Sequence, residues 1–178
     1  KFFNRKIMEL AALLNDKAIK AKEKTELLSK LILDGKVTAD SLLELAGTAK
    51  DPIKATCIEA LEYATKQKPT LINEKNFQFV TATLTEKAPR IKWESAKVIG
   101  NTAHLFSANL DQAIKNLLDN SEHDGTVVRW SAAFALGEIL KLKTKHNGDL
   151  LPALEAISNR EEKNSIKKIY LDAIKKSK

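Results

Sequence analysis

The chain repeats itself every 37 or 38 residues, and this periodicity constrains its fold more than any other feature. Four aligned segments each begin with a cation, namely Lys54, Lys92, Arg129 and Lys167. In every segment the fourth, sixth and seventh residues after the cation are apolar. A period of this length holds two helices and a turn, which is typical of a helical solenoid.

Apolar residues recur at i, i+3, i+4 and i+7 almost throughout, and no segment of useful length alternates apolar with polar residues. Pro52 and Pro89 suit first helical turns, Asp34-Gly35 suits a helix end, and Asp149 is expected to cap a helix opening at Leu150. The expected helices lie near residues 3–14, 16–33, 38–49, 52–67, 71–86, 89–105, 108–120, 125–143, 149–159 and 162–176. Because the connections are short, consecutive helices form antiparallel hairpins. The predicted fold is an all-α, right-handed solenoid of such hairpins.

The length of 178 residues corresponds to one domain over 1–178. We divide it into N-terminal capping helices, 1–37, and four two-helix repeats, 38–178. No run approaches the roughly 18 apolar residues of a membrane span. A single cysteine excludes an internal disulfide. We therefore expect a cytoplasmic protein without membrane contact, of undetermined oligomeric state.

The segment from Gly125 to Ile139 resembles the second helix of the short HEAT repeats in phycobilisome-lyase-like proteins. The segment from Lys92 to Gly100 matches it less fully, and the resemblance extends over about residues 38–176. It implies a HEAT-like architecture and little about activity, because such solenoids host many functions. Gly100 and Gly137 fall inside helices, where each costs about 1 kcal/mol relative to alanine. We expect each to allow close approach of a neighbouring helix.

No pattern in the sequence points to catalysis, a metal or a cofactor. The three histidines lack ligand spacing, and neither a phosphate-binding glycine loop nor a nucleophile elbow occurs. Cys57 lies among apolar residues, so we expect it to be buried. Carboxylates are plentiful, but no pair stands out as an acid/base couple. We predict no catalytic residue, metal site or cofactor.

The aligned cations have two possible roles. In the resembling repeats such a residue commonly bonds to an acidic side chain or free carbonyls of a neighbouring repeat, and Asp51 and Asp124 are candidate partners here. The alternative is a positive row on the concave face that contacts acidic peptide or phosphate. Trp93 and Trp130 each directly follow an aligned cation. They could form a groove for a peptide anchor or an unstacked base, or fill gaps between repeats.

The leading hypothesis is a non-enzymatic interaction module that binds a protein partner on its concave face. Its candidate contact residues are Lys54, Lys92, Trp93, Arg129, Trp130 and Lys167. The alternative is nucleic-acid binding, because HEAT-like alkyl-base DNA glycosylases similarly mix tryptophans with basic residues. That resemblance requires an aspartate beside the tryptophans, whereas Glu94 follows Trp93 here. A third possibility is a lyase-helper role on a tetrapyrrole or its acceptor protein.

The charge distribution favours a protein partner over a nucleic acid. The net charge is +7, but residues 1–30 and 141–178 carry +4 and +5 while residues 31–140 carry −2. Tracking a phosphate backbone requires a continuous positive stripe.

Overall fold

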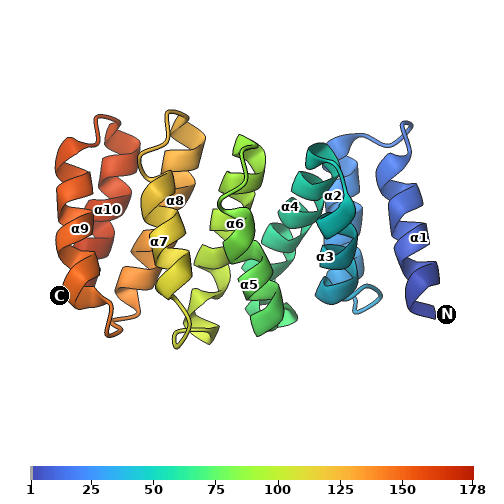
Figure 1. Ribbon diagram of the computed structural model, residues 1–178, viewed down its shortest axis with the longest axis horizontal. Coiled ribbons are helices and arrows are strands. Elements are labelled where there is room, and N and C mark those ends of the chain that lie inside the picture. Colours follow the sequence, from blue (N-terminus) through green and yellow to red (C-terminus); the bar gives the residue numbers. More distant parts are fainter. Residues whose placement is uncertain (1) are drawn as a thin grey trace.

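A computed structural model describes residues 2–178, and the side chains of residues 4–178. It is all-helical over the described residues (Figure 1). The elements are α1 (Phe2–Asn15), α2 (Ala21–Leu33), α3 (Ala39–Thr48), α4 (Asp51–Gln67), η1 (Pro69–Leu71), α5 (Glu74–Thr83), α6 (Pro89–Thr102), η2 (Ala103–Leu105), α7 (Asp111–Asn120), α8 (Thr126–Lys141), α9 (Asn147–Arg160) and α10 (Asn164–Ser177). The predicted all-α solenoid is confirmed.

The helices form two layers that run the length of the molecule (Figure 1). The inner layer consists of α2, α4, α6, α8 and α10, and each of these helices packs along the next one. The outer layer consists of the odd-numbered helices, whose mutual contacts are sparser. A stack whose inner helices lie closer together than its outer ones curves toward the inner layer.

Local sequence signals define several helix ends. Gly35 has a φ of +73° and ends α2, as predicted. The Thr38 hydroxyl accepts a hydrogen bond from Ser41 N at 3.1 Å and caps α3. Asn73 and Asn76 form a reciprocal capping box at the start of α5. Pro52 and Pro89 lie in the first turns of α4 and α6, also as predicted.

Some predicted helix boundaries are wrong. The helix expected over 16–33 begins only at Ala21, because Asp16 Oδ1 accepts a hydrogen bond from Ala18 N at 2.8 Å and holds the chain in a turn. The helix expected over 71–86 begins at Glu74, after the capping box, and ends at Thr83. Asp149 does not cap a helix at Leu150, since α9 already begins at Asn147 and contains Asp149 in its first turn.

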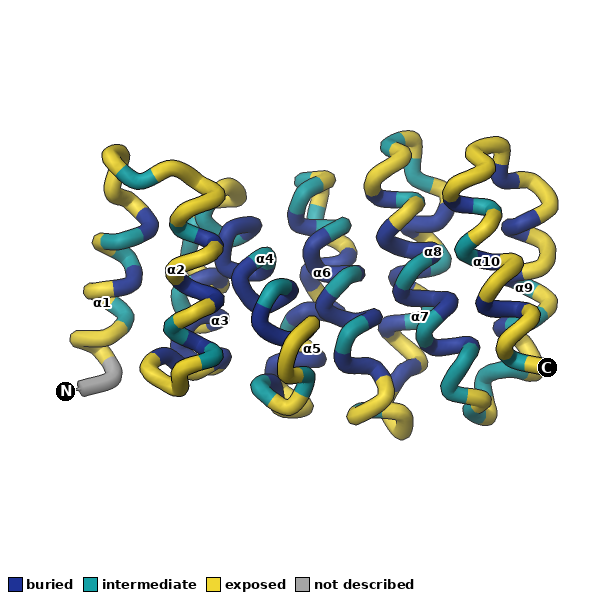
Figure 2. The backbone as a smooth tube through the Cα atoms, turned by 180° about the vertical axis from the view of Figure 1, so that it is seen from behind, coloured by how far each residue is buried: buried dark blue, intermediate teal, exposed yellow. Residues whose placement is uncertain are grey.

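The core runs without interruption through the inner layer. Figure 2 shows buried positions along most of α4, α6 and α8, whereas exposed positions are frequent along α1. The predicted close approaches at two helical glycines are confirmed. A Cβ on Gly100 would lie 2.8 Å from Phe134 Cδ1, and one on Gly137 would lie 3.1 Å from Ala173 Cβ. Each glycine therefore admits a side chain from the next inner helix.

Candidate functional site

The first two aligned cations join neighbouring repeats at one edge of the solenoid. Lys54 Nζ lies 2.8 Å from Glu86 Oε1, in the turn that follows α5. Lys92 Nζ donates to the Leu84 carbonyl at 3.2 Å and to Asn120 Oδ1 at 3.1 Å. These acceptors lie at or just beyond the C-terminal ends of outer helices, where carbonyls lack helical donors. The contacts are of the kind that the structural interpretation of the aligned cations anticipated.

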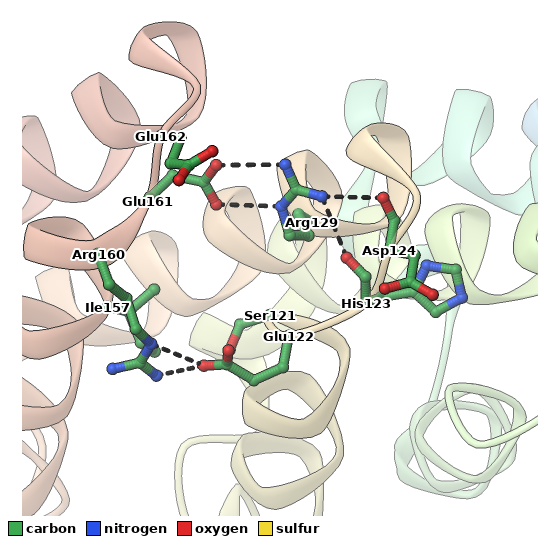
Figure 3. A pocket seen from close by; sticks show the side chains of 9 residues that line it. All are labelled: Ser121, Glu122, His123, Asp124, Arg129, Ile157, Arg160, Glu161 and Glu162. Carbon is green, nitrogen blue, oxygen red and sulfur yellow. Dashed lines mark hydrogen bonds and ion pairs between the residues drawn. The ribbon is translucent and has the colours of Figure 1, made fainter.

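Arg129 makes the most extensive of these junctions (Figure 3). Its Nε and Nη2 donate to the two oxygens of Glu161 at 3.1 and 3.3 Å, a bidentate pair. Its Nη1 donates to the carbonyls of His123 and Asp124 at 3.1 and 3.0 Å. One guanidinium thus links the turn before α8 to the turn before α10. The surrounding hollow is about 310 Å³.

The carboxylate of Glu161 is almost inaccessible, with 5% of its side chain exposed. Burial by itself raises the pKa of Glu161, but the hydrogen bonds from Arg129 and the backbone N–H of Lys163 outweigh it and leave the pKa lowered. A second pair in the same hollow, Arg160 with Glu122, is half exposed (Figure 3). Exposed pairs contribute little, so the Arg129–Glu161 pair dominates the junction.

The predicted carboxylate partners Asp51 and Asp124 are not the ones used. Glu86 and Glu161, each 32 residues after its cation, take that role, and Asp124 contributes only its main-chain carbonyl. The ammonium of Lys167 has no hydrogen bond or ion pair with any group of the described residues, and its backbone N–H makes only the helical bond to the Lys163 carbonyl. Contact between the aligned cations and a partner stays a prediction.

The two tryptophans lie on the inner layer in different environments. Trp93 is half-buried on α6, and its Nε1 donates to Glu94 Oε1 at 2.8 Å. Trp130 is 40% exposed on α8 and stacks on Phe134, with ring centroids 6.0 Å apart and planes 10° apart. This stacking confirms the contact predicted from their i, i+4 spacing. Trp130 therefore offers a rigid apolar surface that Trp93 offers only in part.

Trp130 and Phe134 form one wall of a groove between α8 and α10. One hollow of this α8–α10 groove, of about 280 Å³, is lined by Thr126, Val127, Trp130, Lys163, Ser165 and Ile166. A second, of about 180 Å³, is lined by four apolar or small residues, Phe134, Gly137, Ile169 and Ala173, and by four charged ones, Glu138, Lys141, Asp172 and Lys176. Val127 is 49% exposed. Sequence reasoning missed Val127 and Ile169, because helical spacing alone does not separate an exposed apolar stripe from a buried one.

The inner layer also carries charges, and three of its cations, Arg90, Lys97 and Lys141, are paired with carboxylates. The pairs are Arg90 with Glu59, Lys97 with both Glu62 and Glu94, and Lys141 with Glu138. Glu62 and Glu94 are only 7% and 4% exposed. Burial raises the pKa of both carboxyls, while the nearby Lys97 lowers it by a smaller amount. No pattern along the chain indicates that these two glutamates are buried.

Cys57 lies in the core as predicted, fully buried on α4. Desolvation raises the pKa of its thiol to about 12, so it is protonated at neutral pH. Among residues 4–178 no three histidine, cysteine, aspartate or glutamate side chains converge as metal ligands. None of the helices described here is long and apolar enough to cross a membrane.

The layers, the repeat length and the junctions define an α-solenoid with armadillo/HEAT-like repeats. A designed armadillo repeat protein in complex with the peptide (KR)4 superimposes with a TM-score of 0.70 at 15% identity, over 98% of this chain and 85% of that one. A computationally designed armadillo protein for modular peptide recognition superimposes with a TM-score of 0.72 at 15% identity, over 95% of this chain and 81% of that one. A chain of the complex of CpcE and CpcF of phycocyanin lyase from Nostoc sp. PCC7120 superimposes with a TM-score of 0.71 at 14% identity, over 94% of this chain and 98% of that one. No family model matches the sequence, and no curated protein matches it significantly.

Proposed function

We propose that the protein is a non-enzymatic interaction module that binds an extended segment of a partner protein on its inner layer. The observation that carries this proposal is Trp130, which is 40% exposed, lines one hollow and stacks on Phe134, which lines the other. Tryptophan is enriched among the residues that dominate binding energy, because it buries a large rigid surface with little loss of side-chain entropy. The α8–α10 groove is then the anchoring pocket for an apolar side chain.

The six candidate contact residues contribute unequally in this proposal. Trp130 touches the partner, and Trp93 borders the path of the bound segment one repeat earlier. Lys54, Lys92 and Arg129 position the helices, since their charged groups already bond between repeats. Lys167 lacks such a bond among the described residues, which leaves its ammonium free for an acidic group of the partner. Support also comes from the two designed armadillo proteins, of which one is in complex with the peptide (KR)4 and the other is designed for modular peptide recognition.

The proposal is tested by selecting a random displayed-peptide library on the immobilised wild-type protein. The selected peptides are then synthesised and measured against Trp130→Ala, with Met8→Ala as the control. Met8 is an exposed apolar residue on α1, at the opposite end of the solenoid. We expect Trp130→Ala to weaken binding about 30-fold, which corresponds to a 2 kcal/mol anchor, and Met8→Ala to have no effect. Peptides that bind all three proteins equally would contradict the proposal.

Nucleic-acid binding is the alternative. The pairing of Arg90, Lys97 and Lys141 with carboxylates breaks any positive stripe on the inner layer, which disfavours a phosphate backbone as the ligand. Titration of labelled duplex and single-stranded DNA at two salt concentrations separates the two functions. Tight binding that weakens steeply with salt would support the alternative, and weak binding at both concentrations would support a protein partner.

A further inference from the structure

Three carboxylates, those of Glu59, Glu62 and Glu94, gather on the facing surfaces of α4 and α6. Glu62 and Glu94 share a single ammonium, since Lys97 Nζ lies 3.9 Å from Glu62 Oε2 and 3.4 Å from Glu94 Oε1. Their side chains are 10% and 5% exposed. The neighbouring Glu59 is already paired with Arg90. The charge of Lys66, one turn further along α4, also acts on Glu62. Glu94 therefore has the weakest charge compensation of the three, because its cation is the Lys97 ammonium that it shares with Glu62.

One carboxylate oxygen of Glu94 is left without a partner among the described residues. Glu94 Oε1 accepts hydrogen bonds from both Trp93 Nε1 and Lys97 Nζ. Glu94 Oε2 is buried and has no donor within reach among the described residues. A buried acceptor without a donor costs about 1–3 kcal/mol, and more when it is charged. The negative charges of Glu59 and Glu62 lie close enough to raise the pKa of Glu94 further, beyond the effect of burial. A second cation beside Oε2 would relieve both penalties.

We propose that Glu62 and Glu94 bind a lysine or arginine side chain of the partner segment. This inference rests on the proposed function and specifies the chemistry of the segment. Lys97 is a quarter exposed and is held by no contact shorter than 3.4 Å to either carboxylate, so its side chain can turn aside to admit the second cation. The ligand atom is a guanidinium or ammonium nitrogen, which donates to Glu94 Oε2.

The position of the cluster predicts a spacing within the bound segment. Trp93 borders the cluster on α6, and Trp130 lies on α8, the next inner helix. Packed helices are about 8–10 Å apart, and an extended chain advances about 3.3 Å per residue. The α4–α6 cluster and the α8–α10 groove are two such spacings apart, about 16–20 Å. A segment that places an apolar side chain in the groove therefore reaches the cluster about five or six residues further along. The expected ligand combines an apolar anchor with a basic residue at that distance.

The library selection described above provides the first test when it is repeated on Glu62→Gln and Glu94→Gln. Glu44→Gln on the outer helix α3 is the matched control, because Glu44 is exposed. Glutamine keeps the size of the side chain and removes its charge, and thermal unfolding verifies that each variant is folded. We expect lysine or arginine to be enriched on wild type and Glu44→Gln, and the enrichment to disappear on the two cluster variants. Enrichment of basic residues on all four proteins alike would overturn the assignment.

A second measurement uses one selected peptide and its analogue in which citrulline replaces arginine. The replacement should weaken binding to wild type about 30-fold, the equivalent of 2 kcal/mol. It should weaken binding to Glu94→Gln by less than about threefold. Equal losses on the two proteins would overturn the inference. Selected peptides that depend on Trp130 but contain no basic residue would also overturn it, while the proposed function would stand.

A third measurement is independent of any partner peptide. In Trp130→Phe, Trp93 is the only tryptophan, and its indole reports on the carboxylate that it donates to. Titration with N-acetyl-arginine amide should give a saturable fluorescence change that N-acetyl-citrulline amide does not give and that Glu94→Gln removes. Identical traces for the two compounds would refute the cation site. A saturable change despite a failed library selection would retain the site and reject the proposed function.

Discussion

Replacing Arg129 with alanine should loosen the last hairpin from the rest of the solenoid. The guanidinium makes two hydrogen bonds to Glu161 and two to the carbonyls of His123 and Asp124 (Figure 3). Its removal leaves a carboxylate with a 5% exposed side chain without its cation. Breaking a buried pair by removing one partner costs about 3–5 kcal/mol. At about 2–4 °C per kcal/mol for a chain of this size, the melting temperature should fall by about 6–20 °C.

The assay is thermal and urea unfolding followed by circular dichroism, with Lys167→Ala as the matched control. Lys167 occupies the same repeat position as Arg129, but its ammonium has no hydrogen-bond or ion-pair partner among the described residues, so its replacement should change stability by less than about 0.5 kcal/mol. Hydrogen exchange should rise mainly in α9 and α10, because each repeat contacts only its neighbours.

The pH dependence provides a further check of the same reasoning. Because the folded-state pKa of Glu161 lies below its usual value of about 4.5, the pair stabilises the protein above that pH and the benefit is lost as the pH falls through the lowered pKa. The penalty of Arg129→Ala should therefore be largest at pH 7 and shrink below about pH 4.5. Equal effects of Arg129→Ala and Lys167→Ala, or a penalty that does not change with pH, would refute the reasoning.

Three other predictions follow from particular contacts. Gly100→Ala gains about 1 kcal/mol of helix propensity but forces the Phe134 ring aside, which costs about 1–3 kcal/mol. It should therefore destabilise the wild-type protein and stabilise the Phe134→Ala variant. Urea unfolding of wild type, the two single variants and the double variant measures this coupling, and an equal effect of Gly100→Ala in both backgrounds would contradict it. Because the pKa of Glu94 is raised above about 4.5 in the folded state, its ionisation opposes folding as the pH rises above that value. Glu94→Gln should therefore have a higher melting temperature than wild type at pH 7 and nearly the same melting temperature near pH 4. A difference in melting temperature that does not change with pH would contradict this. Trp93→Ala should cost about 2–3 kcal/mol, less than the 3–5 of a fully buried tryptophan, and Trp130→Ala less than about 1; the reverse order in unfolding experiments would place Trp130 in the core.

The sequence by itself determined the architecture. The repeat of 37 or 38 residues, the helical spacing of apolar residues and the proline and glycine signals sufficed to predict ten helices in a solenoid of hairpins. It also predicted the close approaches at Gly100 and Gly137 and the contact of Trp130 with Phe134. All of these depend on local periodicity or on one repeat copying the next, and both are visible along the chain.

Helix ends were predicted less well, because short polar side chains compete for the backbone there. The turn at Asp16 and the capping box of Asn73 and Asn76 each moved a predicted helix start by three to five residues. Such hydrogen bonds depend on individual side-chain geometry, which periodicity does not contain.

Only the tertiary structure decided the site. Lys54, Lys92 and Arg129 find partners 28 to 32 residues away, and no sequence pattern selects Glu86 over Asp51 or Glu161 over Asp124. Glu62 and Glu94 are buried although they occupy polar positions, because an inner helix is covered on both flanks by its neighbours in the stack. The same stacking half-buries Trp93 and leaves Trp130 exposed. Which side chains line the inner layer is therefore set by how one repeat is placed on the next, a relation between distant segments that the order of residues does not display.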